Sequence, residues 1–521
     1  MSSLPFFFEK LFILEWFCFV PFFMLFYTDK VITARRAFLY GFLLHFTRSC
    51  IVLTWFKELY SMSAVDVPPI IMIVVIFLGD IVLSALQSIP FGFCSILINL
   101  LHKNNANAVF CHIFSAAFFA FTELFQTIIE QTSFLGFIGF PWVVSYITQH
   151  RFLYAIQSSS IFGSIFITFV IILVNSLIAH AICSEKKTRM ISLVSALSVF
   201  SANIVFGIGY ITFDNTESDE NTINAVVYQD NNSSYDKWSG SAKDVCDEFI
   251  YDIEWFFSEG GKADIIVLSE TVFTVRFDPD RAHCSSSGRY ISDKLCDLSE
   301  KHGCAIVFGG FSSDDNGEYN SMFLIDNGVF CDTVYNKRTL VPFGEYLPYE
   351  NILTKLVPAL ENFNLSGSYL KKGENSEVFE CSIADIGGII CYDSIFYYNA
   401  RKSAEDGAQM IALSTNDSWY NDSAAIYQHY AQSSFRAIET DRCLLRSATT
   451  GVSGIIDNHG RSIAKSSIFE KAVVSGAVQK RSSITPFVRF GYTYLYFLTA
   501  MGVLYCGYLY FKLRKSVTCK I

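Results

Sequence analysis

The stretch Ile383-Ala-Asp-Ile-Gly-Gly-Ile-Ile-Cys-Tyr-Asp393 is an apolar run that ends on a thiol and a carboxylate. Short runs rich in Ile and Val that stop at polar residues are typical of buried strands, so residues 386–390 predict a strand with Cys391 at its end. A thiol in that position suits a nucleophile, although packing is the commoner role of a strand cysteine. The surrounding sequence must therefore decide between the two roles.

Seven further runs of the same kind lie between residues 214 and 484, together with helix-like stretches at 242–257 and 424–442. Short strands mixed with helices predict an α/β domain with a packed sheet. Residues 214–240, rich in Asn, Ser and Asp, predict a linker that enters this domain. The seven runs are residues 223–229, 263–268, 304–309, 321–325, 410–413, 444–448 and 454–456.

The sequence on both sides of this domain is strongly apolar. Of 521 residues, 51% are hydrophobic and only 17% are charged, which is typical of a multi-span membrane protein. Because a spanning helix needs about 20 residues, we expect about six spans in residues 1–213 and one in residues 485–521, followed by a basic tail. The first run contains Glu15, so an interfacial helix is the alternative there. The runs are residues 11–27, 38–56, 67–88 with a broken continuation to 101, 108–129, 161–181, 190–213 and 491–511.

Basic residues in the loops predict the orientation. If seven spans alternate, four basic sites share one side, which the positive-inside rule identifies as cytoplasmic, and the α/β domain lies on the opposite side. A net charge of −10 argues against nucleic-acid binding, because a phosphate-binding surface needs clustered Lys and Arg. The basic sites are Lys30, Arg35 and Arg36; His102 and Lys103; Lys186, Lys187 and Arg189; and Lys512, Arg514 and Lys515.

Some polar and aromatic residues in the apolar half need an explanation. Arg48, Asp80 and Glu123 would be costly facing lipid, so we expect them to be paired inside the helical bundle or close to a headgroup layer. Residues 137–142, Phe-Ile-Gly-Phe-Pro-Trp, combine helix breakers with aromatic rings. This composition suits an interfacial loop that touches lipid, or a plain connector.

The cysteines do not predict a metal centre. Eight of the fifteen lie in the α/β domain, with no Cys-x-x-Cys pair and no histidine at metal-ligand spacing, so a zinc site is not expected. Buried free cysteine is the common role, and pairing in an oxidising compartment is the alternative. The eight are Cys246, Cys284, Cys296, Cys304, Cys331, Cys381, Cys391 and Cys443.

Two polar islands could supply what a nucleophilic thiol needs. Thiol catalysis requires a base for the proton and a positive donor for the oxyanion. Glu270 follows the apolar run 263–269, and Lys337 lies in a charged loop that contains Pro342 and Gly344. Each residue alone is weak evidence, because a Glu after a strand or a lone Lys is usually solvated.

Taken together in the order Glu, Lys, Cys, with gaps of 67 and 54 residues, these islands resemble the carbon–nitrogen hydrolase (nitrilase) superfamily. The neighbouring residues strengthen the resemblance: Tyr319-Asn-Ser321, Phe343-Gly-Glu-Tyr-Leu-Pro348, Ile390-Cys-Tyr-Asp393, Ser414-Thr-Asn-Asp-Ser-Trp419 and Arg436-Ala-Ile-Glu439. The resemblance implies an αββα sandwich for residues 214–484. It also implies that Glu270 is the general base, Lys337 stabilises the oxyanion and Cys391 is the nucleophile.

The same resemblance implies four supporting roles. The Tyr392 amide would be a second oxyanion donor, and Glu345 would orient Lys337 or assist proton transfer. Trp419 would lie near an acyl chain, with a core or interfacial aromatic as the alternative. Asp393 stands where the family commonly has Glu, so the carboxylate is kept but is one methylene shorter. Leu268 is a second departure, since Trp is expected two residues before the base.

With membrane spans on both flanks, the chain resembles the apolipoprotein N-acyltransferase family of the bacterial inner membrane. That resemblance implies transfer of an acyl chain from a phospholipid, through a Cys391 thioester, to the α-amino group of a lipoprotein's diacylglyceryl cysteine. It implies a periplasmic catalytic domain and no metal or organic cofactor. The family usually has eight spans, and this sequence predicts seven.

Two alternatives remain at this level. A membrane-anchored nitrilase-type amidase would share the Glu, Lys and Cys residues but would not need so many spans. A transporter or structural membrane protein with a silent hydrolase-like domain would not need the three residues intact.

Overall fold

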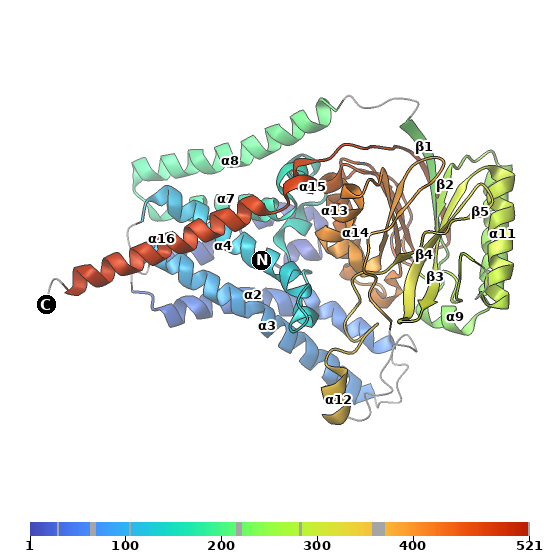
Figure 1. Cartoon of the computed structure of the whole chain (residues 1–521). Coiled ribbons are helices and arrows are strands. Elements are labelled where there is room, and N and C mark those ends of the chain that lie inside the picture. The colour runs from blue at the N-terminus through green and yellow to red at the C-terminus, as the bar shows by residue number, and fades with distance from the viewer. Residues whose placement is uncertain are drawn as a thin grey trace. The chain divides into compact units, whose positions relative to one another are not determined.

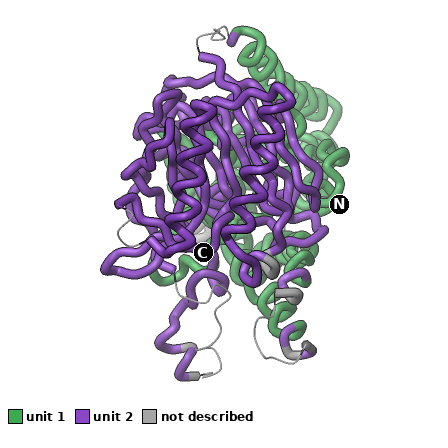
Figure 2. Tube along the Cα trace, turned by 90° about the vertical axis from the view of Figure 1, so that its right-hand side faces the viewer, with its two compact units in different colours: residues 1–57, 73–213, 490–521 green, residues 58–72, 214–489 purple. Residues whose placement is uncertain are grey.

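The computed structural model describes residues 1–28, 31–62, 69–103, 106–214, 221–280, 284–356 and 370–518. The chain divides into two compact units (Figure 2). Unit 1 comprises residues 1–57, 73–213 and 490–521, and unit 2 comprises residues 58–72 and 214–489. Unit 1 is helical and unit 2 is α/β (Figure 1), which confirms the predicted combination of a helical membrane part with a nitrilase-like domain.

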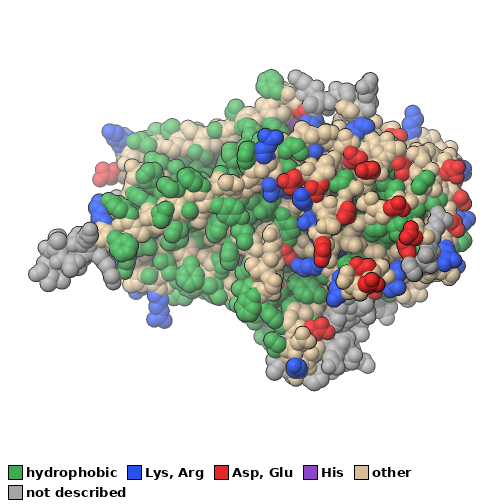
Figure 3. All heavy atoms as spheres, viewed as in Figure 1, with side chains coloured by type: hydrophobic (Ala, Val, Ile, Leu, Met, Phe, Trp, Pro, Cys, Tyr) green, Lys and Arg blue, Asp and Glu red, His purple; other side chains and the backbone are tan. Residues whose placement is uncertain are grey.

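Unit 1 is built from long apolar helices. Within the described residues, seven helical stretches are long and apolar enough to cross a membrane, as the sequence predicts. Hydrophobic side chains cover their surface, whereas charged side chains gather over unit 2 (Figure 3). The seven stretches are Glu9–Thr28, Ala34–Leu59, Met72–Lys103, Ala108–Glu130, Ile165–Cys183, Lys186–Thr212 and Thr493–Lys512.

The helices of unit 1 differ from the predicted spans in their details. The first span is a 3₁₀ helix followed by a short α-helix, and the third is one continuous helix that contains Pro90. The α-helices are α1 Val20–Thr28, α2 Ala34–Val52, α3 Pro69–Lys103, α4 Ala108–Glu130, α5 Leu153–Ile156, α6 Ser159–Phe162, α7 Ile165–Cys183, α8 Lys186–Thr212 and α16 Thr493–Thr518. The 3₁₀ helices are η1 Leu4–Phe6, η2 Glu9–Trp16, η3 Leu53–Met62, η4 Gly136–Ile138 and η5 Ser145–Gln149.

The charged residues in the spans of unit 1 have polar partners. Arg48 forms an ion pair with Glu15 at 2.5 Å, and both side chains are buried. Glu123 accepts hydrogen bonds from the Ser145 amide at 2.9 Å and from Thr168 Oγ1 at 2.6 Å. Asp80 accepts one from Ser84 at 3.1 Å. The expectation of pairing inside the bundle is therefore confirmed.

The aromatic loop 137–142 packs within unit 1. Trp142 is only 2% exposed and stacks on Phe140 with 5.2 Å between the ring centroids. Gln87 donates its amide to the carbonyls of Ile138 and Phe140, at 3.0 Å each. The loop is thus partly buried, with Phe137, Ile138 and Phe140 half-exposed.

Unit 2 contains two sheets. The first has the order β13-β1-β2-β3-β4-β5, with β6 also paired to β4, and the second has the order β12-β11-β10-β9-β8-β7. The strands of the first sheet are β1 Thr222–Gln229, β2 Ile265–Val267, β3 Ala305–Asp314, β4 Gly317–Asp326, β5 Val329–Phe330, β6 Tyr335–Asn336 and β13 Ala472–Gln479. Those of the second are β7 Val378–Phe379, β8 Ile386–Ile390, β9 Met410–Thr415, β10 Leu444–Ala448, β11 Gly454–Ile456 and β12 Ser462–Lys465.

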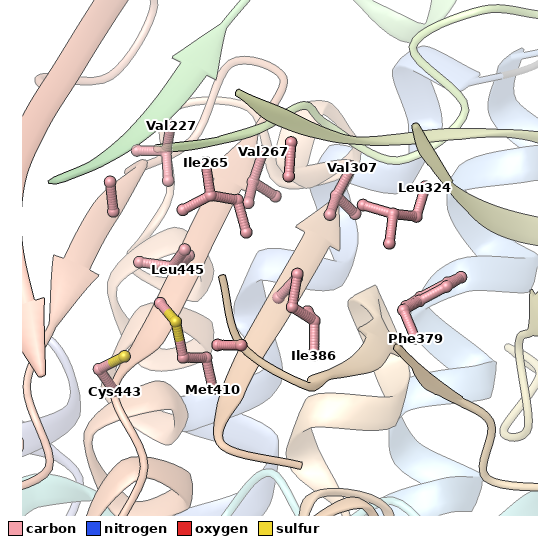
Figure 4. Packing of buried hydrophobic residues seen from close by; sticks show 14 of the residues in the cluster. Val227, Ile265, Val267, Val307, Leu324, Phe379, Ile386, Met410, Cys443 and Leu445 are labelled. Carbon is pink, nitrogen blue, oxygen red and sulfur yellow. The ribbon is translucent and has the colours of Figure 1, made fainter. Parts of the chain in front are cut away.

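The two sheets face each other across a core of branched side chains. Val227, Ile265 and Val307 of the first sheet point toward Ile386 and Leu445 of the second (Figure 4). A second buried cluster fills the space between the first sheet and helices α10 Ala242–Ser258 and α11 Ser286–His302. Helices α13 Tyr397–Glu405 and α14 Ala424–Thr440 cover the second sheet. This αββα arrangement is the predicted sandwich.

Parallel strands place polar loops at one edge of each sheet of unit 2. Strands β1, β2 and β3 run parallel, and so do β8, β9 and β10. The carboxyl ends of parallel strands meet at one edge of a sheet, and ligand sites commonly lie there. Glu270 follows β2, Cys391 follows β8 and Asn416 follows β9. The remaining elements are α9 Ser234–Ser239, η8 Cys391–Ile395, η9 Asp417–Tyr420, α12 Glu350–Leu356 and α15 Pro486–Phe490.

Candidate active site

Glu270 is held in a tight loop after β2. The next residue, Thr271, has a left-handed backbone with φ of 42°, which is uncommon for a β-branched residue. The loop presses against Gly309 on β3, where an added Cβ would lie 2.4 Å from the Thr271 nitrogen. Only glycine permits this approach. The loop therefore fixes the backbone position from which the Glu270 side chain extends.

Three donors then fix the Glu270 carboxylate, which is only 6% exposed. Oε1 accepts from Lys337 Nζ at 2.9 Å and from Asn320 Nδ2 at 2.7 Å. Oε2 accepts from the backbone amide of Asn416 at 2.8 Å. The structure thus joins two of the three predicted catalytic residues directly.

Lys337 lies at the centre of a buried cluster. It follows β6, and its amide donates to the Asn320 carbonyl at 2.9 Å, which places the side chain beside β4. Its ammonium is 1% exposed and also contacts Glu345 Oε1 at 2.9 Å. The amide of Val341 donates to Glu345 Oε2 at 2.8 Å. Glu345 thus lies between the Lys337 ammonium and the Val341 amide.

These contacts set the charge states of the pair. Burial alone would disfavour the ionised form of Glu270, but the charge of Lys337 and its hydrogen bond outweigh burial and hold the pKa of Glu270 below its usual value. Burial also opposes the charge of Lys337, whereas the two carboxylates raise its pKa well above the ordinary value. The site therefore holds an ionised carboxylate and a charged ammonium at neutral pH.

Cys391 opens η8 in a strained conformation. Its φ of 47° is a left-handed backbone that few non-glycine residues adopt, and such strain is enriched at functional sites. Burial and the nearby Glu270 charge raise the pKa of the Cys391 thiol, against the opposing effect of Lys337. A hydrogen bond with Thr415, at the end of β9, partly offsets the rise. The thiol is therefore neutral and lies within the field of both predicted partners.

The two residues after Cys391 are buried. The ring of Tyr392 packs edge to face on Phe396 with 5.1 Å between centroids. Asp393 accepts from the amides of Thr339 at 2.7 Å and Ile390 at 3.1 Å, and from the Tyr335 hydroxyl at 2.9 Å. The shorter carboxylate thus ties the strand end of Cys391 to the loop after Lys337.

The sequence also raised expectations about Trp419 and Leu268, which lie near Glu270 in the chain or in the fold. Trp419 lies half-buried in η9, three residues after the Asn416 amide that bonds Glu270. Leu268, which replaces the Trp expected there, is fully buried in the cluster between the first sheet and α10 and α11. It fills that core, so the departure from the family pattern does not leave a gap beside Glu270.

The structure adds two residues that the sequence did not single out. Asn320 bridges the two glutamates, because its amide also donates to Glu345 Oε1 at 3.2 Å. Lys237 is 5% exposed and donates to the backbone carbonyl of Glu270 at 2.5 Å. It lies on α9, inside the segment predicted as a linker. In the sequence, Lys237 is a single basic residue without a motif around it, whereas Asn320 belongs to the motif Tyr319-Asn-Ser321.

The described parts of the chain contain neither a cluster of metal-ligand side chains nor a disulfide. There, no group of three or more His, Cys, Asp or Glu side chains is arranged to hold a metal ion. The seven other cysteines of the α/β domain form no disulfide, in line with the commoner of the two expectations. The polar groups at the strand ends are an ion pair, a second carboxylate and a thiol.

This combination of fold and residues defines a class. Residues 203–485, more than half of the chain, match the model of the carbon–nitrogen hydrolase family. The chain belongs to the carbon–nitrogen hydrolase family. Residues 1–177 match a second model, described as the apolipoprotein N-acyltransferase N-terminal domain.

Curated relatives extend this likeness across both parts of the sequence. The apolipoprotein N-acyltransferase of Borreliella burgdorferi is 26% identical over 73% of this chain and 73% of that protein. The one from Geobacter metallireducens is 27% identical over 73% of this chain and 71% of that protein. The one from Thermotoga maritima is 32% identical over 41% of this chain and 40% of that protein. The predicted resemblance to the apolipoprotein N-acyltransferases is confirmed.

Solved structures match part of the chain. A carbon–nitrogen hydrolase from Helicobacter pylori G27 is 18% identical, covers 50% of this chain and 90% of its own, and has a TM-score of 0.38. An amidase from Nesterenkonia sp. is 16% identical, covers 53% and 95%, and also has a TM-score of 0.38.

Proposed function

We propose that this chain is an apolipoprotein N-acyltransferase. It moves an acyl chain from a phospholipid, through a thioester on Cys391, to the α-amino group of the N-terminal diacylglyceryl cysteine of an apolipoprotein. The observation that carries the proposal is the buried Glu270–Lys337 ion pair, whose charges act on the Cys391 thiol, in a chain whose described residues include seven long apolar helical stretches.

In the first half-reaction, Glu270 accepts the proton of the Cys391 thiol as sulfur attacks the sn-1 ester carbonyl. Lys337 and the Tyr392 amide stabilise the oxyanion that forms. When the carbon–oxygen bond breaks, Glu270 returns the proton to the glyceryl oxygen. A lysophospholipid leaves and the acyl chain remains on sulfur as a thioester.

In the second half-reaction, the α-amino nitrogen attacks the thioester carbonyl and Glu270 accepts its proton. The carbon–sulfur bond then breaks, an amide forms, and the thiolate regains a proton from Glu270. A single carboxylate can serve both steps because it alternates between base and acid. The ionised state of Glu270 and the neutral thiol in the free protein support this assignment.

The supporting residues have distinct proposed roles. Glu345 orients Lys337, which its 2.9 Å contact supports. Asp393 ties the nucleophile's turn to the lysine loop through its bonds to Ile390 and Thr339. Trp419, half-buried in η9, contacts the acyl chain. Because the protein has no need to move electrons or polarise water, we propose that it works without a metal or organic cofactor.

We propose further that the protein is a multi-pass protein of the bacterial inner membrane, with residues 214–484 as its periplasmic catalytic domain. The chain leaves apolar helices before this domain and re-enters one after it, so both acylated substrates and the site are confined to the same membrane surface. A reporter fused after Asp214 or Ser483 should then register as periplasmic, and one fused after Lys187 or Lys515 as cytoplasmic. A cytoplasmic signal from the domain would contradict the orientation.

Transfer can be tested with the full chain reconstituted in phospholipid vesicles. We expect a synthetic peptide that begins with diacylglyceryl cysteine to gain one acyl chain while one lysophospholipid appears for each peptide modified. A peptide with a blocked α-amino group is the control and should remain unmodified. Hydrolysis of small amides without any acyl transfer would instead identify a membrane-anchored amidase.

A further inference from the structure

A buried hydrogen-bonded network lies behind the nucleophile, on the side of its backbone carbonyl. Ser394 Oγ donates to the Cys391 carbonyl oxygen at 2.7 Å. His429 Nε2, from α14, lies 2.9 Å from Ser394 Oγ and 3.3 Å from the same carbonyl oxygen. The carbonyl of Cys391 is therefore contacted by two side chains from different elements.

The far side of the histidine is also held. Nδ1 of His429 lies 2.9 Å from Asp417 Oδ1 and 3.2 Å from Arg446 Nη2, while Arg446 and Asp417 form an ion pair at 2.6 Å. Gly451 packs against this pair, since a Cβ there would lie 2.3 Å from Asp417 Oδ2. Nδ1 has a partner whether it carries a proton or a lone pair, so the ring is held in either state.

The network resembles a Ser–His–Asp triad, but it cannot act as one. Ser394, His429, Asp417 and Arg446 are each 0% exposed, so no substrate reaches the serine. The serine hydrogen is also committed to the Cys391 carbonyl. These side chains therefore act through the backbone of the nucleophile.

The hydrogens of the network point in one direction. Because Ser394 gives its only hydrogen to the carbonyl, its oxygen can only accept from His429, so we assign a proton to Nε2. Donation then runs from His429 through Ser394 to the Cys391 carbonyl, while Arg446 Nη2 donates to the Asp417 carboxylate that lies beside Nδ1. Successive hydrogen bonds polarise one another, and the effect is strongest in a dry environment.

We propose that Ser394, His429, Asp417 and Arg446 form a positioning network that polarises the peptide group between Cys391 and Tyr392. The carbonyl of that peptide accepts from the network, and its N–H is the amide assigned to the oxyanion in the proposed function. Drawing electron density onto the carbonyl oxygen makes the N–H a stronger donor. This inference rests on the proposed acyl transfer.

Ser394→Ala in the full chain tests the network with a small change of volume. We expect acyl-enzyme formation from vesicle phospholipid to slow about five- to tenfold, because polarisation strengthens an oxyanion donor without replacing it. Alkylation of Cys391 by iodoacetamide, followed on the Cys391 peptide by mass spectrometry, should be unchanged. That displacement forms no oxyanion, so it reports the position and reactivity of the thiol alone.

Ser299→Ala is the matched control, because Ser299 is equally buried and donates to the carbonyl of Cys304 at the same 2.7 Å, on α11. It should lower neither rate. His429→Gln is a second variant, and it should slow acylation and spare alkylation as Ser394→Ala does. Equal acylation by the wild type and Ser394→Ala would overturn the network, as would a parallel loss of alkylation. A wild-type chain that forms no acyl-enzyme at all would instead overturn the proposed function.

Discussion

Among the buried ion pairs of the described residues, two look alike, one in each unit. In unit 1, Arg48 and Glu15 are 3% and 0% exposed, and the guanidinium also lies over the Phe6 and Phe19 rings. In unit 2, Lys337 and Glu270 are 1% and 6% exposed. Burial therefore does not distinguish a structural pair from a functional one.

The surroundings of the two pairs do distinguish them. Arg48 forms one ion pair, with Glu15, and its guanidinium lies over two phenylalanine rings. Lys337 serves two carboxylates, and its charge and that of Glu270 act on a thiol whose backbone is strained. Burying a second carboxylate beside a thiol and a strained turn lowers the stability of the folded protein. Such destabilising arrangements are found mainly at functional sites. The candidate active site is therefore distinguished by a lysine, two carboxylates and a thiol lying together, and not by buried charge alone.

The largest effect should come from the thiol itself. Cys391→Ala should abolish both thioester formation and acyl transfer, because no other group replaces the nucleophile. Cys443→Ala is the control, since Cys443 is also buried in the core between the sheets and lies outside the site. Transfer assays on membranes with equal amounts of each protein make the comparison. Residual transfer by Cys391→Ala would place the nucleophile elsewhere.

The next effects separate proton transfer from oxyanion stabilisation. Glu270→Gln removes the proton acceptor at nearly constant size, so both half-reactions should slow by roughly two to four orders of magnitude. Lys337→Met should slow them about a hundred- to a thousandfold, as expected for loss of an oxyanion donor. Pre-steady-state acylation measures the first half-reaction, and phospholipid binding should be retained in both variants. Normal acylation by Glu270→Gln would point to Glu345 or Asp393 as the base.

Sequence reasoning predicted Glu270, Lys337 and Cys391 as a catalytic set because each follows an apolar run or stands in a charged loop. Glu270 follows a strand of the first sheet and Cys391 one of the second, and the packing of the two sheets places both strand ends in the same region. Lys237 and His429 gave no such signal. Lys237 lies on a six-residue helix in a polar segment that resembled a linker, and His429 is one histidine in an otherwise ordinary amphipathic helix.

The strands also show that only segments with a local apolar pattern could be predicted from the sequence. The periodic runs predicted β1, β8, β10 and β11 to within one residue, because their branched side chains are buried. Strand β12 was not predicted, since its residues are largely exposed and lack an apolar pattern. Strand β13 alternates small residues and pairs with β1 from almost 250 residues away. The pairing of β13 with β1 depends on tertiary contacts, and a local sequence pattern does not predict it.

A smaller effect on catalysis is expected from replacing Lys237. The charge of Lys237 helps to hold down the pKa of Glu270, so Lys237→Met should raise that pKa. A base is active only when it is ionised, so the acidic limb of the kcat/KM profile should move to higher pH while the rate above that limb changes little. Lys237→Arg should move the limb less. A profile identical to that of the wild type would show that Lys237 does not act on the base.

The smallest effect on chemistry is expected in unit 1. Arg48→Met leaves Glu15 buried without its partner, which should destabilise the fold by about 3–5 kcal/mol. The double variant with Glu15→Gln should recover much of that loss. Acylation per folded molecule should remain at the wild-type rate in both. A hundredfold loss of acylation in folded Arg48→Met protein would contradict the distinction drawn between the two pairs.

The most direct test of the central claim is intact-protein mass spectrometry of the full chain in phospholipid vesicles without an acceptor peptide, followed by peptide mapping. The account predicts a mass increase of one acyl chain, located on Cys391 and removed by neutral hydroxylamine, as a thioester requires. The adduct should disappear when diacylglyceryl-cysteinyl peptide is added. A chain that stays unmodified, or that is acylated on a residue other than Cys391, would contradict the account.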